Sequence, residues 1–271
     1  MRSPKELSLD SKILKAVSGL GLSPKAAEAA RLVLEDGEVH SLQEYANTVS
    51  IKRLGYNDHG PVHMRTVALN AAIMMGLLRE AGVKTSLETE ECGAFEDSLI
   101  AVILAATLHD LGMSISRQAH ELHSMTLARP VLDRLLPLIY PETSTQQVIV
   151  RSLVLEAIFG HMGNRVIHSL EAGVLLIADG CDMTKGRARI PMVLASSPRV
   201  GDIHKYSANA IEEVKILRGR EKPIHVNILM SGEVGLFQVE EVLLGKIAAS
   251  PAKGYVELYA VIQDGEPKRY L

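Results

Sequence analysis

Leu99-Ile-Ala-Val-Ile-Leu-Ala-Ala-Thr-Leu-His-Asp-Leu-Gly112 is the stretch of this sequence that decides the fold. The residues as far as Leu108 are almost all apolar, and His109 and Asp110 follow them directly. A helix that is apolar on every side belongs in the centre of a bundle. Burying an imidazole and a carboxylate at its end is costly unless they are paired, hydrogen-bonded or bound to a cation. The sequence therefore predicts a metal site at the end of a central helix.

The segments around this stretch are typical of further helices, from about residue 8 to residue 190. Ser23-Pro24 and Gly60-Pro61 are good helix starts, because proline is favoured at the first helical position. Gly112 is expected to cap the central helix, and Pro130 is expected to break or kink the helix that contains it. The predicted helices cover residues 24–34, 42–53, 61–82, 95–111, 117–136, 145–159 and 169–183.

The period of the apolar residues changes in the last quarter of the chain. A loop rich in proline, serine and glycine lies between 191 and 201, and beyond it the apolar residues alternate with a period of two. Strands are predicted at 209–217, 224–230 and 255–262, with a helix at 233–248. We therefore expect a mainly α protein: a helical domain over 1–195, followed by a small α/β domain with β-β-α-β order over 200–271.

Composition excludes several classes of function. The net charge is −3, aromatic residues make up 4% of the chain and tryptophan is absent, which argues against a nucleic-acid-binding surface. The tail from 200 onward has nine basic and ten acidic residues and so has no basic excess either. Two cysteines without a CxxC spacing, no signal peptide and no apolar run of membrane-spanning length indicate a soluble cytoplasmic protein without a membrane partner.

Other helices must supply the remaining ligands, because His109 and Asp110 point about 100° apart on a helix. His63 in the first turn of its own helix and Asp179 in a later one are the candidates. A mixed set of imidazoles and carboxylates suits Mn, Fe, Zn, Ni or Co better than calcium.

The order His63, His109-Asp110, Asp179 resembles the H…HD…D signature of the HD superfamily of metal-dependent phosphohydrolases, which are helical bundles. The phrases 58–63 and 178–187 look like an archaeal or bacterial branch of that superfamily, and the resemblance covers about residues 40 to 190. It implies that these four residues bind a divalent ion. It also implies hydrolysis of a phosphomonoester or phosphodiester bond, often in a nucleotide.

Other residues are candidates for the chemistry of such a site. Asp110 would both hold the metal and steer the proton of the attacking water, while Arg117 would act in catalysis by contacting phosphate. Lys185 and Arg187 are further candidates for phosphate contact, because arginine in particular suits phosphate oxygens. Asp182, three residues after Asp179 on the same helix face, is expected to orient a ligand or to cap nearby amides.

One ion is expected, and a second ion is the alternative. Some members of the superfamily bind a second metal with histidines between the HD pair and the last aspartate. His120, His123 and His161 lie in that interval and are candidates for a second metal or for phosphate contact. His120 and His123 share a helix face, but His161, between two glycines, is the best single candidate.

Two other functions stay open at this point. One is a regulatory module that binds metal and nucleotide without turning them over, and the other is a di-iron oxygenase of the same fold. The expected substrate is a small phosphate-containing molecule. A sheet of three strands and one helix is a marginal unit, so we also expect completion by the bundle or by a second copy in a homodimer.

Overall fold

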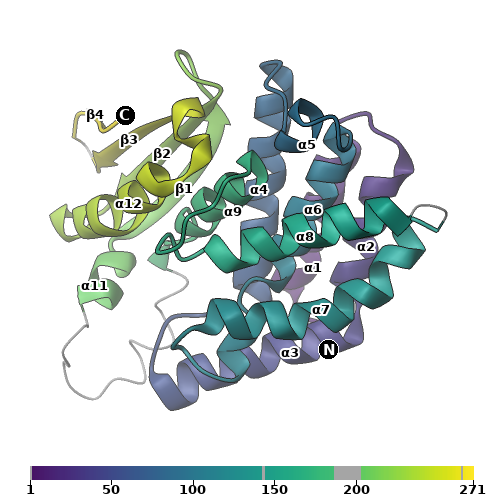
Figure 1. Ribbon diagram of the computed structural model, residues 1–271. Coiled ribbons are helices and arrows are strands. Elements are labelled where there is room, and N and C mark those ends of the chain that lie inside the picture. Colours follow the sequence, from purple (N-terminus) through teal and green to yellow (C-terminus); the bar gives the residue numbers. More distant parts are fainter. Residues whose placement is uncertain (1, 142–143, 186–202, 264) are drawn as a thin grey trace.

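The computed structural model describes residues 2–141, 144–185, 203–263 and 265–271. Helices make up the chain as far as residue 180, and a small sheet with its own helices follows (Figure 1). The α-helices of the first part are α1 Pro4–Ser18, α2 Pro24–Glu35, α3 Gly37–Thr48, α4 Pro61–Glu80, α5 Ser86–Thr89, α6 Phe95–Leu108, α7 His120–Ile139, α8 Ser144–Gly160 and α9 Leu170–Gly180. The predicted helices are thus confirmed as elements, and α1 and α5 are additional.

Helix α6 is the centre of the bundle, as its composition predicts. It packs against α2, α4, α8 and α9, and almost every one of its residues is buried. The stretch Phe95–Ser114 is apolar and long enough to span a membrane, but it is almost wholly buried by the other helices. This burial is what a core helix of a globular domain requires, and it positions His109 and Asp110 in the interior.

The starts of the helices follow from local side chains. The hydroxyl of Ser23 accepts from the Lys25 amide at the start of α2, and Pro24 occupies the first position. Pro61 likewise begins α4, two residues before His63. These starts match the sequence prediction and fix where His63, the first of the predicted ligands, lies in its helix.

Two local predictions were wrong in detail. Helix α6 ends at Leu108, and Gly112 lies in a 3-10 turn, Leu111–Ser114, rather than at the cap of α6. A Cβ at Gly112 would lie 2.1 Å from the His120 carbonyl oxygen and 2.6 Å from the Ser124 nitrogen. Gly112 therefore allows α7 to approach the turn closely. Pro130 was expected to break or kink its helix; α7 does not break there and continues to Ile139.

The C-terminal module contains a four-stranded sheet. Its elements are α11 Ile203–Asn209, β1 Ile211–Arg218, β2 Ile224–Met230, a π-helix Gln238–Leu243, α12 Leu244–Ala249, β3 Val256–Ile262 and β4 Lys268–Arg269. The strand order is β1-β2-β3-β4, with β2 and β3 parallel and the other neighbours antiparallel. The predicted β-β-α-β order is confirmed, and the short β4 is an addition. The predicted boundary between 195 and 200 lies outside the described residues.

The module lies against the bundle, with α12 beside α9 (Figure 1). The side chains of Ile224, Val226, Ile228 and Met230 are buried, while the residues between them are half-buried. The period of two predicted for this strand is therefore present, and the module shares one apolar core with the helices.

Candidate metal centre

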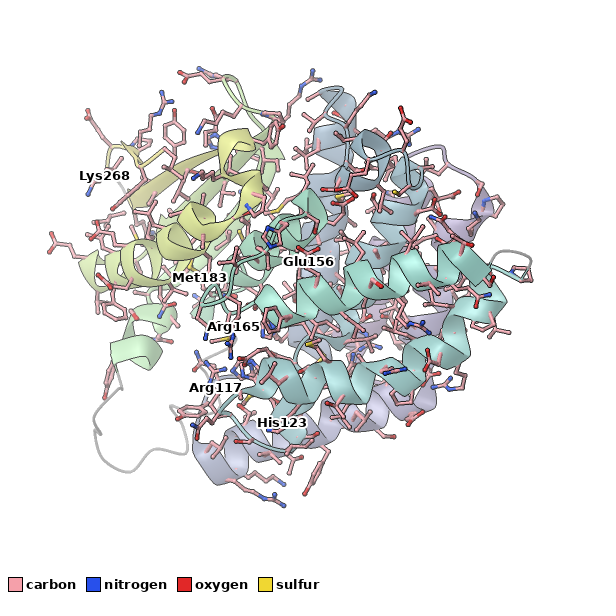
Figure 2. The ribbon with its side chains drawn as sticks, viewed as in Figure 1. Arg117, His123, Glu156, Arg165, Met183 and Lys268 are labelled. Carbon is pink, nitrogen blue, oxygen red and sulfur yellow. The ribbon has the colours of Figure 1, made fainter. Side chains whose placement is uncertain are left out.

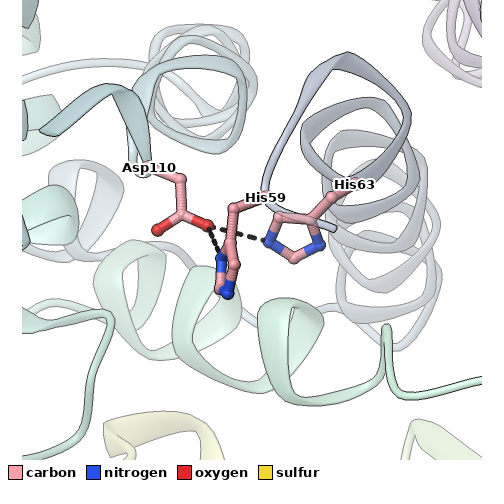
Figure 3. A group of neighbouring side chains, drawn as sticks. All are labelled: His59, His63 and Asp110. Carbon is pink, nitrogen blue, oxygen red and sulfur yellow. Dashed lines mark hydrogen bonds and ion pairs between the residues drawn. The ribbon is translucent and has the colours of Figure 1, made fainter. Parts of the chain in front are cut away.

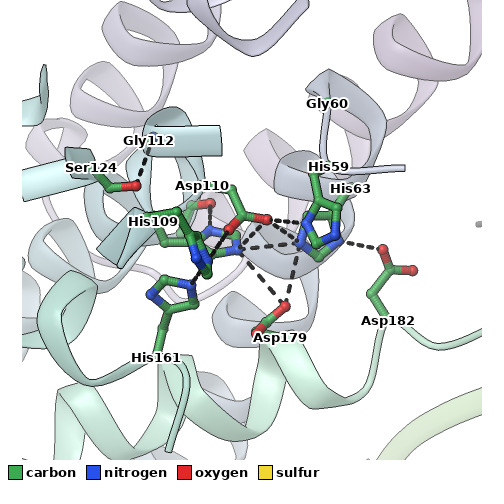
Figure 4. A network of polar contacts seen from close by, with 12 residues as sticks. His59, Gly60, His63, His109, Asp110, Gly112, Ser124, His161, Asp179 and Asp182 are labelled. Carbon is green, nitrogen blue, oxygen red and sulfur yellow. Dashed lines mark hydrogen bonds and ion pairs between the residues drawn. The ribbon is translucent and has the colours of Figure 1, made fainter. Parts of the chain in front are cut away.

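Four buried side chains from α4, α9 and the end of α6 converge on one point (Figure 4). His63 Nε2 lies 3.2 Å from Asp110 Oδ2 and 3.3 Å from Asp179 Oδ1. His109 Nε2 lies 3.5 Å and 3.7 Å from the same two oxygens. The two imidazole Nε2 atoms are 3.2 Å apart. The four ligands expected from the sequence are thus brought together, and we call this point the first position.

The other oxygen of Asp110 faces a second group of imidazoles. Asp110 Oδ1 lies 3.2 Å from His120 Nε2 and 3.4 Å from His161 Nε2. The Nε2 atoms of His120 and His161 are 3.0 Å apart. His123 takes no part in these contacts and is half-buried on the same helix, α7. We call the point between Asp110, His120 and His161 the second position.

In the four imidazoles of the two positions, the Nδ1 atom, which points away from the centre, contacts an acceptor, and this contact fixes the tautomer. The Nδ1 contacts are His63 to Asp182 Oδ2 at 2.7 Å, His109 to Ala106 O at 2.9 Å, His120 to Arg117 O at 3.0 Å and His161 to Ile158 O at 2.7 Å. A carbonyl or carboxylate oxygen only accepts, so each Nδ1 carries the hydrogen. All four rings therefore turn Nε2 toward the centre, the arrangement of histidines that ligate metals.

The two carboxylates are ionised despite their burial. Burial opposes the charge of Asp110, but the imidazoles of His109 and His59 hold its pKa well below the usual range. Burial also opposes the charge of Asp179, and the Lys246 ammonium together with the His109 imidazole keeps its pKa well below the usual range. The centre thus offers anionic oxygens to both positions.

This geometry fits divalent cations. Burial lowers the pKa of His161 to about 4, so at neutral pH its ring is neutral and its Nε2 carries a lone pair without a hydrogen. The facing Nε2 atoms of His120 and His161 cannot share a hydrogen bond unless His120 carries a second proton. The same condition holds for His63 and His109. A cation held by each pair and the adjacent carboxylate oxygens would satisfy all these lone pairs at once.

His59 joins the centre from the loop before α4 (Figure 3). Its Nδ1 lies 2.7 Å from Asp110 Oδ2, the oxygen that also faces His63. The side chain of His59 is 13% exposed, so it lies at the edge of the buried cluster. His59 therefore supports Asp110 from the loop that precedes α4.

The predicted phosphate contacts are only partly near the centre. Arg117 is half-buried beside the second position: its Nη1 lies 3.2 Å and 3.3 Å from the two ring nitrogens of His120, Nδ1 and Nε2, and 3.8 Å from Met162 Sδ. Figure 2 labels Arg117 near the start of α7. Lys185 is exposed and forms an ion pair with Glu212. Arg187 lies outside the described residues.

Sequence reasoning missed Lys246. Its ammonium contacts Asp179 Oδ2 and donates to the carbonyl oxygen of His161 at 2.9 Å. Lys246 lies far from both residues in the chain, on a helix of the C-terminal module. No local motif marks it, because only the packing of α12 against α9 brings it to the centre.

Comparison with known proteins agrees with the geometry. The family described as "HD domain" matches residues 62–184, the segment that carries all six centre residues from His63 to Asp179. The chain is 40% identical over 235 residues to "Uncharacterized protein MJ1020" of Methanocaldococcus jannaschii, covering 87% of this chain and 88% of that protein. No solved structure matches. With this family match, this relative and these ligands in the expected order, the chain belongs to the HD superfamily.

Proposed function

We propose that the protein is a divalent-metal-dependent phosphohydrolase that cleaves a phosphomonoester or phosphodiester bond in a small molecule such as a nucleotide. The observation that carries the proposal is the shared carboxylate: the two oxygens of Asp110 face two separate groups of imidazoles. Two cations on one carboxylate are typical of enzymes that hydrolyse phosphate esters. The coarser conclusion, an HD domain with a buried group that could hold metal, rests on the family match and on the clustering itself.

The proposal assigns residues to both positions. His63, His109, Asp110 and Asp179 would hold a metal at the first position, and Asp110, His120 and His161 would hold one at the second. The nitrogen and oxygen donors suit Mn, Fe, Ni, Co or Zn. When bound, such ions lower the pKa of a water toward neutrality and neutralise charge on the phosphoryl oxygens. The second position makes two ions, rather than one, the favoured number.

The remaining residues orient the ligands and the substrate. Asp182 holds the ring of His63 through Nδ1, and His59 donates to the shared carboxylate. Arg117 has two tasks in this proposal. Its carbonyl oxygen fixes the tautomer of His120, and its guanidinium beside that ring would contact a phosphoryl oxygen of the substrate.

Charge and composition favour a small substrate. The net charge of −3 gives no attraction for a polyanion such as a nucleic acid. Both cysteines are free, one exposed and one buried, which is compatible with the reducing cytoplasm that we propose as its location.

A substrate panel tests the proposal. Purified protein with Mn²⁺, Ni²⁺ or Co²⁺ would be incubated with generic phosphomonoesters, generic phosphodiesters and nucleotides, and released phosphate or product would be measured. We expect hydrolysis that EDTA abolishes and that Asp110→Ala lacks. Tight nucleotide binding with no turnover would instead favour a regulatory module. Two irons per chain with consumption of O₂ would favour the di-iron oxygenase.

A further inference from the structure

We infer that the C-terminal module completes the metal centre, and that Lys246 is the positioning residue through which it does so. The inference rests on the proposed metal binding, and not on any particular substrate. It assigns the module a direct part in the centre, in addition to whatever else its sheet does.

Lys246 reaches both positions at once. Its ammonium contacts the outer oxygen of Asp179, whose inner oxygen faces His63 and His109. The same ammonium donates to the main-chain carbonyl of His161, a residue of the second position, at 2.9 Å. One cation from outside the bundle therefore ties a ligand of the first position to the backbone of a ligand of the second.

The contact has a consequence for the coordination of Asp179. A carboxylate can bind a metal through one oxygen or through two. Because Lys246 occupies Oδ2, Asp179 presents only Oδ1 to the imidazoles of the first position. The Lys246 side chain is only 13% exposed, so a competing water has little access to this ion pair. A partner that orients a ligand in this way commonly decides metal affinity.

Two glycines of α9 allow the C-terminal module to approach the backbone of this helix closely. Gly173 and Gly180 lie seven residues apart on α9, which is two turns and therefore one face of the helix. A Cβ at Gly180 would lie 2.9 Å from Leu243 Cδ1 and 3.1 Å from Lys246 Cδ. A Cβ at Gly173 would lie 2.6 Å from Ser250 Oγ, which donates to the Gly173 carbonyl at 3.0 Å.

These glycines let the segment 243–252 lie directly on the backbone of α9, and we call this contact the seam. The aliphatic part of Lys246 runs along this seam, near Gly180 and also 3.8 Å from where a Cβ at Gly163 would be. The position of the ammonium is thus set by main-chain packing between the module and α9. A lysine on a freely moving surface would not be held against two ligand residues.

Three variants test the inference in the full-length protein. Lys246→Met keeps most of the apolar length of the side chain and removes the charge, Lys246→Arg keeps the charge, and Lys253→Met removes an exposed lysine from the same module. Metal-stripped protein would be titrated with Mn²⁺ or Co²⁺ against a chelator of known affinity. The readout is the metal dissociation constant, which needs no substrate.

We expect Lys246→Met to bind metal about 10- to 100-fold more weakly than wild type, as is usual when a residue that orients a ligand is lost. Lys253→Met should match wild type, and Lys246→Arg should recover part of the loss. Coulomb's law alone predicts the opposite sign, because removing a cation from the centre favours a second cation. Unchanged or tighter metal binding by Lys246→Met would therefore overturn the inference.

A second pair of variants covers the case in which Lys246→Met does not fold. Gly180→Ala presses on Leu243 and Lys246 without touching the charge, whereas Gly245→Ala on α12 meets nothing within 4 Å. Weaker metal binding by Gly180→Ala, but not by Gly245→Ala, supports the role of the seam; equal binding by both contradicts it. Failure of the proposed function gives a different result from failure of this inference. The wild-type protein would then bind metal and hydrolyse no phosphate ester, while Lys246→Met would still bind metal more weakly than wild type.

Discussion

The Nε2 atoms of His120 and His161 lie 3.0 Å apart, although each ring directs its Nδ1 toward a main-chain carbonyl. With His161 neutral, two lone pairs oppose each other inside the protein unless a cation or an additional proton lies between them. This relationship has its counterpart at His63 and His109, and Asp110 lies between the two pairs. The centre is therefore an arrangement that bound cations would stabilise.

Loss of Asp182 should weaken the first position. In Asp182→Asn the Nδ1 of His63 loses its charged acceptor, which lies at 2.7 Å, so the ring is held less firmly in its orientation. We expect metal affinity or hydrolytic activity to fall about 10- to 100-fold. Asp133→Asn, at a carboxylate that is 43% exposed on α7, is the matched control and should bind metal like wild type. Equal metal affinity in the two variants would show that Asp182 does not orient the ligand.

Gly112→Ala should destabilise the fold and disturb the second position. The new methyl group would overlap the carbonyl oxygen of His120. That oxygen belongs to the backbone, so the movement of a flexible side chain cannot relieve the overlap. Overpacking of this kind costs about 1–3 kcal/mol or more in the free energy of unfolding. Urea denaturation measures it. Gly245→Ala, in open space within a helix, should instead raise the free energy by roughly 0.5–1 kcal/mol.

Arg65 should be essential for stability. Its side chain is 1% exposed and donates to Asp10 at 2.7 Å, to Gln43 at 3.0 Å and to the Leu34 carbonyl at 3.1 Å. Arg65→Met leaves the buried Asp10 carboxylate with Arg2 as its remaining charged partner. It also removes a donor from Gln43, and breaking a buried charged pair typically costs about 3–5 kcal/mol in the free energy of unfolding. Arg151→Met removes a largely solvent-exposed pair with Asp133 and should cost no more than about 1 kcal/mol. Similar losses for both variants would contradict this account of Arg65.

The ionised Glu257 carboxylate should stabilise the C-terminal module at neutral pH and cease to do so in acid. Burial opposes the charge of Glu257, but hydrogen bonds from His225 and from the amides of Arg220 and Glu221 lower its pKa to about 2 from the usual 4.5. A carboxylate whose pKa is lower in the folded state stabilises the fold above its unfolded pKa. That contribution is lost as the pH falls from about 4.5 toward 2.

The comparison that checks this is wild type against Glu257→Gln, because other titrating groups cancel between them. The difference in the free energy of unfolding between wild type and Glu257→Gln should have its largest value at pH 7 and should decrease as the pH falls from about 4.5 toward 2. A difference that stays constant or grows as the pH falls would contradict the pKa assigned to Glu257.

The sequence predicted the first position well because each of its ligands lies in a recognisable helix and in the order of a known signature. His63 follows a Gly-Pro helix start, and His109-Asp110 ends the most apolar segment of the chain. Alternation alone predicted β2, since one face of that strand is buried. These are properties of single elements, so they can be found without knowing how elements pack.

The rest depends on packing between elements. His120 begins α7 and His161 directly follows α8. Their meeting depends on how closely α7 approaches Gly112, which looked like a helix cap in the sequence. Lys246 looks like any surface lysine until α12 is placed on the glycine face of α9. Pro130 was expected to break or kink α7, but the helix does not break, and contacts of its apolar face with other elements keep it continuous.

Metal content is the most direct test of the account. Wild-type protein loaded with Mn²⁺ or Co²⁺ and passed through a desalting column should retain two ions per chain, measured by plasma mass spectrometry against protein concentration. His161→Ala should retain fewer ions than wild type, and Asp110→Ala should retain the fewest, because it removes a ligand from both positions. Equal metal in wild type and Asp110→Ala would contradict the claim that this carboxylate joins two cation sites.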